Sequence, residues 1–355
     1  MIQFSDSFPF IIAGPCSAES QEQVYSIALE LQQKASIQLF RAGIWKPRTR
    51  PGSYEGVGEK GLAWLQKIQQ ELSMPVCIEV ATAQHVELAL KYGIDVLWIG
   101  ARTTVNPFSV QEIAEALQGV NIPVMVKNPM YADLQLWIGA IERLKKVGIQ
   151  EIAAVHRGFF SGNTTVYRYP PMWQIPIELR LQFPDIPIFC DPSHITGNSM
   201  LVAEVSQNAL DMEMQGLMIE VHNTPTQALS DAKQQITPTA LQTLLQELKI
   251  KQATIPNTVA TQKLHEIRQK IDTIDDTLLQ MLATRIELVK QIAIVKQENE
   301  LTILQLDRWK EIMATRPEKA KEMLIDTNFV KQLFQLIHDD SIYEQLRFMQ
   351  RNNNP

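Results

Sequence analysis

The sequence predicts an α/β protein, a (β/α)8 TIM barrel followed by a C-terminal all-α domain. The distribution of turn-forming residues supports this division. All 15 glycines lie at or before Gly216, and 17 of the 19 prolines lie at or before Pro256. Glycine and proline serve tight turns and are excluded from long helices. The first part of the chain is therefore rich in turns, and the last part is helical.

The turn-rich part contains eight short apolar runs that alternate with helical stretches. Most of the runs are apolar on both faces, which is typical of a parallel sheet covered by helices. In chain order they are residues 10–14, 37–43, 76–80, 96–100, 124–128, 152–158, 186–191 and 217–222. Eight strand–helix units in about 250 residues predict a closed barrel. A doubly wound open sheet is the competing fold, but no Gly-x-Gly-x-x-Gly turn follows any of the runs.

Amphipathic segments between the runs predict the helices of the barrel. The clearest are residues 21–34, 83–92, 134–147 and 238–248. Ser20 begins a Ser-x-x-Gln pattern that resembles a capping box, and Thr237 is an N-cap before a proline at the first helical position. We expect a barrel domain over residues 1–250 and a linker over residues 251–260.

The sequence predicts an all-α domain over residues 261–355. From Leu264 to Val295 apolar residues recur three or four positions apart, the spacing of a helix packed along a seam. A helix over residues 261–299 would be about 58 Å long, too long for a small domain of one chain to cover. We therefore expect a second chain to supply a partner helix, in a homodimer or a higher even oligomer. Periodicity alone also fits a dimerising coiled coil, but Arg285 lies in the seam, where a cation needs an anionic partner.

Composition excludes several classes of protein. The chain is 45% hydrophobic and 20% charged, which excludes intrinsic disorder. A net charge of −6 argues against binding to nucleic acid. Three scattered cysteines are too few for a disulfide framework and predict a reducing compartment. No export signal and no apolar stretch of membrane-spanning length are visible, so we expect a cytoplasmic protein without a membrane partner.

Basic residues follow most of the predicted strands. In a barrel of this kind, functional side chains gather at the carboxyl ends of the strands. A ring of cations there would suit phosphate and carboxylate groups, which arginine binds in bidentate fashion and lysine binds as a point charge. The basic residues are Arg41, Lys46, Arg48, Arg102, Lys127, His156 and Arg157.

A second group of side chains is distant in sequence. His194, Glu220 and Asp231 belong to the seventh and eighth strands, and Cys16 follows the first. Closing the barrel makes the eighth strand the neighbour of the first, so the four side chains can converge. A thiolate, an imidazole and two carboxylates suit a divalent transition metal. The alternative is that Cys16 is simply a small buried apolar residue.

Six short motifs together resemble 3-deoxy-arabino-heptulosonate 7-phosphate (DAHP) synthase. They are Gly-Pro-Cys-Ser at 14–17, Lys-Pro-Arg-Thr at 46–49, Gly-Ala-Arg-Thr at 100–103, Asp-Pro-Ser-His at 191–194, Glu-Val-His at 220–222 and Leu-Ser-Asp at 229–231. The resemblance implies that a divalent ion of manganese, iron, cobalt or zinc is held by Cys16, His194, Glu220 and Asp231. It also implies that Lys46 donates a proton to the aldehyde oxygen.

The same resemblance implies two substrate sites. Phosphoenolpyruvate would be held by Arg41, Lys46, Arg102, Lys127 and Arg157. Erythrose 4-phosphate would be held by Arg48 and Thr49 at its phosphate and by Asp191 near its hydroxyl groups. The related octulosonate-phosphate synthases are a rival, but they place a different motif where this chain has Lys-Pro-Arg-Thr.

The tail resembles the all-helical class of chorismate mutase, through Arg268, Arg285, Lys296, Arg308 and an ending that contains Ser341 and Gln345. The resemblance implies that Arg285 and Arg308 bind the carboxylates of chorismate, with Arg268 supplied by the partner subunit. Lys296 and Gln345 would contact the ether oxygen, and Ser341 would seat the substrate. The resemblance also implies three helices that form an intertwined homodimer. Two positions depart from the family pattern. Trp309 stands where a glutamate is usual, and Gln305 replaces a common aspartate.

The sequence therefore predicts a bifunctional enzyme of aromatic amino-acid synthesis, with feedback on the synthase through the helical domain. The alternative is a DAHP synthase whose tail is a catalytically weak module for dimerisation and sensing. A metal-binding scaffold without catalytic activity is a further class, which an assay of carbon–carbon bond formation would distinguish.

Overall fold

The structure is a computed structural model that describes residues 2–47, 52, 54–162, 165–252 and 258–353. The chain divides into two compact units, Met1–Ala253 and Thr254–Pro355. Each unit is described by itself. Within the described residues, no helix is both long enough and apolar enough to cross a membrane.

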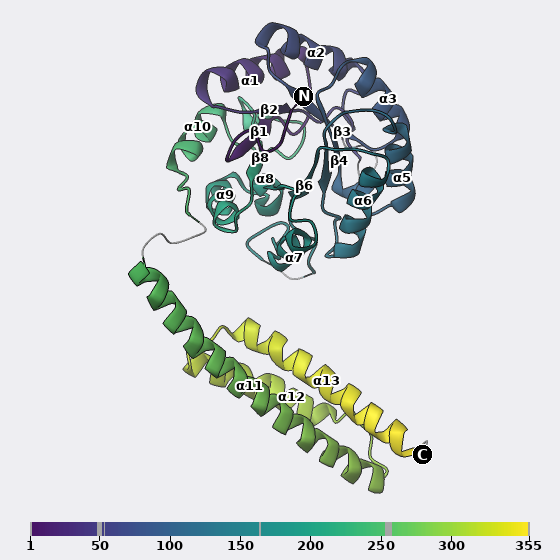
Figure 1. Ribbon diagram of the computed structural model, residues 1–355, viewed down its shortest axis with the longest axis vertical. Helices are drawn as coiled ribbons and strands as arrows, with labels where there is room; N and C mark the ends of the chain where they lie inside the picture. Colours follow the sequence, from purple (N-terminus) through teal and green to yellow (C-terminus); the bar gives the residue numbers. More distant parts are fainter. Residues whose placement is uncertain (1, 48–51, 53, 163–164, 253–257, 354–355) are drawn as a thin grey trace. The chain divides into compact units, whose positions relative to one another are not determined.

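The first unit is a closed barrel of eight parallel strands in the order β1 to β8 (Figure 1). This confirms the predicted barrel and excludes the open sheet, because β1 pairs with β8 from Phe10–Gly216 to Gly14–Glu220. The strands are β1 (Phe10–Gly14), β2 (Leu39–Arg41), β3 (Val76–Val80), β4 (Val96–Ile99), β5 (Val124–Lys127), β6 (Ile152–His156), β7 (Ile188–Cys190) and β8 (Gly216–Glu220). Six of the eight strands are shorter than their predicted apolar runs, β2 and β7 most of all.

Helices surround the strands on the outside of the barrel (Figure 1). Ser20 accepts a hydrogen bond from the Gln23 backbone N–H at 3.1 Å, and Thr237 accepts one from that of Ala240 at 3.1 Å, as expected of N-caps. The helices are α1 (Gln21–Lys34), α2 (Lys60–Leu72), α3 (Ala83–Lys91), α4 (Ala101–Thr104), α5 (Pro107–Ala116), α6 (Leu134–Lys146), α7 (Gln174–Gln182), α8 (Pro192–Thr196), α9 (Val202–Asp211) and α10 (Pro238–Glu247), with short 3-10 turns η1 (Ser199–Leu201) and η2 (Pro225–Gln227).

Alternation along the strands divides the apolar side chains into two layers. One layer packs between strands and helices, and the other fills the barrel interior. Phe4, Phe10 and Phe189 pack together in the interior, with ring centroids 5.4 to 5.8 Å apart. Trp98, fully buried, belongs to the same layer. The barrel is therefore a packed core, and its functional groups lie above this core at the carboxyl ends of the strands.

The second unit consists of three helices, as predicted: α11 (Thr258–Glu298), α12 (Leu306–Glu322) and α13 (Thr327–Asn353). α11 begins at Thr258, inside the segment predicted as a linker, and residues 253–257 of that segment lie outside the described part of the chain. The first half of α11 exposes its apolar seam. Ile271, Ile274 and Leu278 are each 50 to 59% exposed.

Candidate active sites

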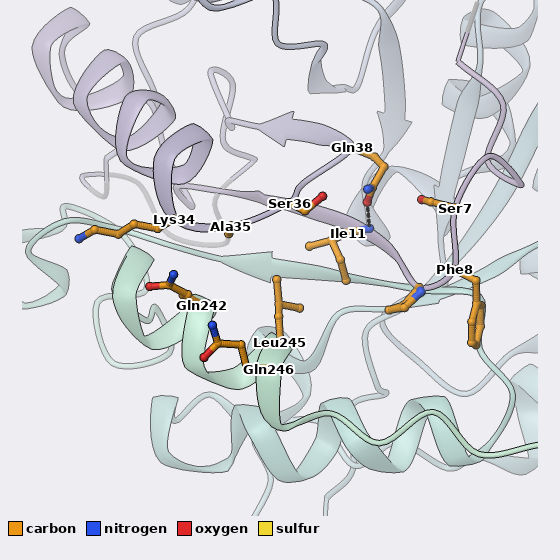
Figure 2. A pocket seen from close by; sticks show the side chains of 11 residues that line it. Ser7, Phe8, Ile11, Lys34, Ala35, Ser36, Gln38, Gln242, Leu245 and Gln246 are labelled. Carbon is orange, nitrogen blue, oxygen red and sulfur yellow. Dashed lines mark hydrogen bonds between the residues drawn. The ribbon is translucent and has the colours of Figure 1, made fainter.

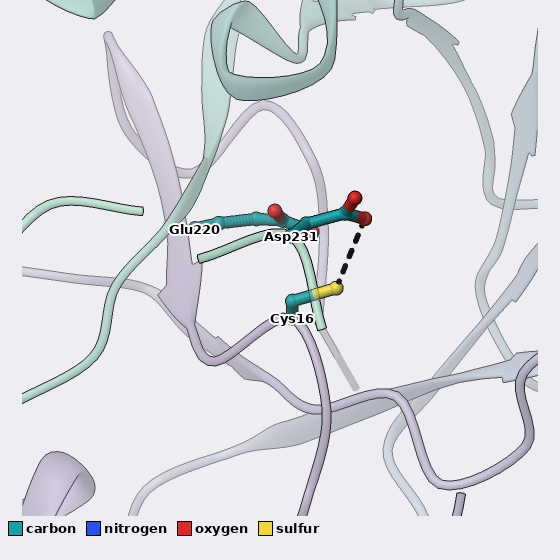
Figure 3. Close-up of side chains that lie close together, drawn as sticks. All are labelled: Cys16, Glu220 and Asp231. Atoms are coloured by element: carbon teal, nitrogen blue, oxygen red, sulfur yellow. Dashed lines mark hydrogen bonds between the residues drawn. The ribbon is translucent and has the colours of Figure 1, made fainter. Parts of the chain in front are cut away.

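Three of the four predicted metal ligands converge at the junction of β8 and β1. Ligand atoms of Cys16, Glu220 and Asp231 all lie within 4.8 Å of one another, and Cys16 Sγ lies 3.5 Å from Asp231 Oδ2 (Figure 3). The β1–β8 pairing places Gly14 opposite Glu220, so Cys16, two residues further along, lies beside the end of β8. Barrel closure therefore joins residues that are about 200 positions apart in sequence.

The cluster is a buried concentration of negative charge. Burial and the nearby Glu220 and Asp231 carboxylates raise the pKa of the Cys16 thiol to about 12, although Lys46 and Arg41 act in the opposite direction. Burial acts to raise the pKa of Asp231, but His194 and Arg168 hold it well below its ordinary value. Two carboxylates and a thiol this close repel one another when ionised.

His194 and Asp191 lie next to this cluster, at the start of α8. Asp191 caps the helix by accepting a hydrogen bond from the His194 backbone N–H at 3.0 Å. His194 Nδ1 lies 2.8 Å from Asp191 Oδ2 and 3.8 Å from Glu220 Oε1. Burial lowers the pKa of His194, with Asp191 and Glu220 opposing the shift. A neutral imidazole beside the cluster is a suitable fourth ligand.

A pair of buried cations lies over Trp98, beside the cluster. Arg41 donates to Glu220 Oε1 at 3.0 Å, and Lys127 Nζ lies 2.6 Å from Asp191 Oδ2. Their charged groups lie 5.2 and 5.8 Å from the centre of the Trp98 ring, within cation–π range. Arg41 Nε and Nη1 are buried and make no hydrogen bond to any described residue. A buried guanidinium with two such N–H groups is suited to an anionic ligand.

The other predicted cations differ in their surroundings. Arg157 is buried over the Tyr169 ring at 3.8 Å, and its Nη1 finds no hydrogen-bond partner among residues that the structure describes. Lys46 Nζ lies 3.3 Å from Cys16 Sγ, beside the cluster. Arg102, on α4, is exposed. The predicted positions Arg48 and Thr49 lie outside the described residues.

The donor set fits a divalent metal ion. One sulfur and two carboxylate oxygens lie close enough to share an ion, with an imidazole 3.8 Å from one of the carboxylates. The pKa of about 12 of the Cys16 thiol reflects burial and negative neighbours, and a bound cation would reverse this effect and deprotonate the sulfur. Mixed sulfur, nitrogen and oxygen ligands suit manganese, iron, cobalt and zinc better than magnesium or calcium.

The helical unit has a cavity of about 440 Å³ lined by Arg285, Lys296, Arg308, Ser341 and Gln345. Lys296 Nζ donates to Gln345 Oε1 at 3.0 Å, and Arg285 donates to the Ser341 hydroxyl. Burial lowers the pKa of Lys296 and that of Arg285. Five predicted residues from three helices therefore surround one cavity of a size that suits a small polyanion.

Of the remaining residues singled out in this unit, Arg268 and Trp309 do not line the cavity. Arg268 is exposed on the first half of α11. Trp309 stacks on His338, with ring centroids 4.1 Å apart and planes at 15°. Gln305 and His338 line the cavity themselves. Trp309, one of the two departures from the family pattern, therefore forms an aromatic stack with His338 at the cavity edge.

A different cavity, of about 510 Å³, opens at the amino ends of β1 and β2, away from the cluster at the carboxyl ends. Figure 2 shows Leu245 of α10 extending toward Ile11, with Gln242 and Gln246 of the same helix beside it. Its lining carries one cation, Lys34. It lacks the charged groups that distinguish the site at the carboxyl ends.

Comparison with known families identifies both units. Residues 2–255 match the DAHP synthetase I family, well over half of the chain. The chain belongs to the DAHP synthetase I family. Residues 267–346 match chorismate mutase type II, so the protein is a DAHP synthase domain fused to a C-terminal chorismate mutase domain. Both domains are of enzymatic families.

Known relatives cover the synthase domain. The phospho-2-dehydro-3-deoxyheptonate aldolase of Thermotoga maritima is 30% identical over 248 residues, which are 70% of this chain and 71% of the relative. A crystal structure of a DAHP synthase from that organism superimposes with a TM-score of 0.61 at 30% identity, covering 68% of each chain. The 2-dehydro-3-deoxyphosphooctonate aldolase of Wolinella succinogenes is 31% identical, covering 67% of this chain and 97% of the relative.

The structure of the synthase domain also brings in two residues that sequence analysis missed. Arg168 Nη1 donates to Asp231 Oδ1 at 3.0 Å, and Gln234 Nε2 donates to Glu220 Oε2 at 2.7 Å. Arg168 lies in a long connection after β6 and has no neighbouring motif to mark it. Gln234 lies only three residues after Asp231, and that proximity was the available signal.

Proposed function

We propose that the barrel condenses phosphoenolpyruvate with erythrose 4-phosphate to give DAHP and inorganic phosphate, and that the helical domain rearranges chorismate to prephenate. The observation that carries the first half is the convergence of Cys16, Glu220 and Asp231 beside buried cations. A condensation of two phosphorylated substrates needs fixed positive charge to offset their repulsion, together with a group that activates the aldehyde.

The proposed phosphoenolpyruvate site uses the N–H groups that the protein leaves without partners. Arg41 Nε and Nη1 and Arg157 Nη1 are buried without a hydrogen bond to the described part of the chain. Lys127 adds a third buried cation, and exposed Arg102 approaches from the rim. Phosphate and carboxylate oxygens of the substrate would accept hydrogen bonds from these N–H groups. This explains why the fold tolerates buried donors that lack a protein partner.

In the proposed reaction, C3 of phosphoenolpyruvate forms a bond to the aldehyde carbon, water adds to C2, and the C2–O bond to phosphate breaks. A divalent ion held by Cys16, His194, Glu220 and Asp231 would supply Lewis acidity at the aldehyde oxygen. Lys46 Nζ, 3.3 Å from Cys16 Sγ, is positioned to donate the proton that this oxygen takes up. Asp191, which already pairs with Lys127, would orient the hydroxyl groups of the aldehyde substrate.

The second candidate for the barrel is octulosonate-phosphate synthesis, because an octulosonate relative matches the same domain. The two activities differ in the aldehyde, erythrose 4-phosphate against arabinose 5-phosphate. Arg48 and Thr49, proposed to hold the phosphate of erythrose 4-phosphate, lie outside the described residues. We expect phosphate release from phosphoenolpyruvate with erythrose 4-phosphate, and preference for arabinose 5-phosphate would reverse the assignment.

The proposal for the helical domain rests on the pairing of Lys296 and Gln345 inside its cavity. An intramolecular rearrangement needs a compressed conformer and donors at the oxygen on which charge develops. Lys296 and Gln345 would serve the ether oxygen, Arg285 and Arg308 would bind the carboxylates, and Ser341 would seat the substrate. Arg268 would come from the partner subunit of a homodimer whose seam is the exposed apolar face of α11.

The alternative for this domain is a module for dimerisation and sensing with weak mutase activity, which the Trp309–His338 stack favours. Conversion of chorismate to prephenate by the full chain distinguishes the two. We also propose feedback, because a ligand in the helical cavity could bias how the domain docks. Equal synthase rates with and without saturating prephenate or chorismate would exclude this feedback. If the coupling between the two sites is thermodynamic, it must act in both directions. The three free, buried cysteines support a cytoplasmic location.

A further inference from the structure

Two consecutive buried glutamines follow the Asp231 ligand position. Gln234 is 1% exposed and Gln235 is 2% exposed, low values for a polar side chain. The segment that carries them lies beside the end of β8, where Ile236 and Val221 form a parallel bridge. The Ile236 backbone N–H donates to Glu220 O at 3.0 Å, and the His222 N–H donates to Ile236 O at 2.9 Å. This backbone pairing places both carboxamides beside the cluster.

Gln234 links the two carboxylates of the cluster. Its Nε2 donates to Glu220 Oε2 at 2.7 Å, and its Oε1 accepts from Arg168 Nη1 at 3.0 Å. The same Arg168 nitrogen donates to Asp231 Oδ1 at 3.0 Å. An ionised carboxylate only accepts and a guanidinium only donates, so the orientation of the amide is determined by its partners.

Gln235 similarly restrains the backbone at the third ligand position, Cys16. Its Oε1 accepts from the Cys16 backbone N–H at 3.0 Å, and its Nε2 donates to Ser230 O at 2.9 Å. The loop that bears Cys16 is thereby tied to the residue before Asp231. Asp231 itself has a φ of 46°, a backbone conformation that side-chain-bearing residues rarely adopt. The contacts of its neighbours help to hold it there.

We propose that Gln234 is a positioning residue that fixes the Glu220 and Asp231 carboxylates at the spacing that a divalent metal ion requires. The inference rests on the proposed function, in which the cluster holds that ion. Arg41 already holds Glu220 Oε1, and Gln234 restrains Oε2, so the plane of the carboxylate is fixed. Because the carboxamide is neutral, it orients Glu220 without cancelling the charge that attracts the ion. Loss of such outer partners weakens metal binding by about 10- to 100-fold.

The test is titration of the metal-free, full-length chain with Co²⁺, by calorimetry and by the absorption of a sulfur–cobalt bond. Gln234→Met keeps the length of the side chain and removes both hydrogen bonds. The matched control is Gln215→Met, at the opposite end of β8. Gln215 accepts from the Ile188 N–H at 2.8 Å and donates to Glu213 O at 2.9 Å, far from the cluster.

We expect Gln234→Met to bind Co²⁺ about 10- to 100-fold more weakly than the unmodified chain and with an altered absorption envelope, while Gln215→Met binds normally. Equal affinity of Gln234→Met and the unmodified chain would overturn the inference. So would equal weakening of both variants in step with lowered melting temperatures, because that is the result of a merely structural role.

Arg168→Met provides a second variant in case Gln234→Met does not fold, since the Arg168 side chain is 44% exposed. We expect weaker Co²⁺ binding, and a double variant whose loss is smaller than the combined single losses, because the two residues act through one network. Fully additive losses would contradict this. If the unmodified chain binds no Co²⁺, the metal site of the proposed function fails, a result distinct from failure of the Gln234 inference.

Discussion

Replacing His156 with leucine should remove part of the barrel's sensitivity to acid. His156 is fully buried among Trp137, Phe159 and Trp173, with ring centroids 5.3 to 6.5 Å away. Burial, and secondarily the charge of Arg157, lower its pKa from 6.5 to about 3. The Pro171 backbone and the Asp191 carboxylate favour the protonated ring, but they do not offset its burial.

The direction of this pH effect on stability follows from proton uptake by the unfolded chain. Between pH 6.5 and about 3 the unfolded chain binds a proton at His156 that the folded chain does not. The stability contributed by the neutral imidazole is therefore complete above about pH 6.5 and falls as the pH drops toward 3. From about pH 7 to about pH 5, this one group should lower the free energy of unfolding by about 2 kcal/mol.

Urea unfolding at these two pH values, followed by tryptophan emission, measures the effect, since five of the six tryptophans lie in the barrel unit. Between pH 7 and pH 5, the free energy of unfolding of His156→Leu should fall by about 2 kcal/mol less than that of the unmodified chain. Phe159→Leu is the control, because it alters the same aromatic cluster without a titratable group and should follow the unmodified chain. An identical pH dependence for His156→Leu and the unmodified chain would refute the reasoning.

Further predictions concern the ion pairs, the helical cavity and the core. Arg41→Met leaves the buried Glu220 carboxylate without its cation and should destabilise the metal-free barrel by about 3 kcal/mol; an unchanged melting temperature would contradict this. Lys296→Met should lower mutase kcat by about 100-fold and spare the synthase, as followed by separate assays, whereas loss of both activities would indicate misfolding. A chelator should abolish synthase activity and leave mutase activity intact; synthase turnover that survives it argues against a metal. Leu31→Ala, in the fully buried face of α1, should cost about 2 to 5 kcal/mol in urea unfolding, and a much smaller loss would mean that the site collapses to fill the gap.

Most of the barrel was predictable because local rules and the fold agree. Apolar runs bounded by turns gave strands near their observed positions, and α1 was predicted with its observed bounds, Gln21–Lys34. The predictions were less accurate where neighbours determine pairing. Residues 37–43 have the apolar character of a longer strand, but β2 is only Leu39–Arg41, because only these residues pair in register with β1 and β3.

The candidate site was predictable in kind but not in detail. Basic residues after the strands indicated an anion site, since strand ends point to one face of a barrel. Whether each of these basic side chains is buried could not be predicted from the sequence in the same way. Arg41 and Lys127, the last residues of β2 and β5, are buried over Trp98, whereas Arg102, on α4 after β4, is exposed. The difference depends on whether a side chain points over the packed interior or out toward the rim.

The sequence by itself determined the two units, the order of the strands and the chemical types of side chain at the strand ends, because these follow from residue periodicity and turn chemistry. Only the tertiary structure decided which side chains meet. Barrel closure, which the sequence predicts, brings Cys16 to Glu220, but the parallel bridge between Ile236 and Val221, which brings Gln234 to the same carboxylate, appears only in the structure. Such contacts depend on distances between elements that are remote in sequence, and no local pattern of residues specifies them.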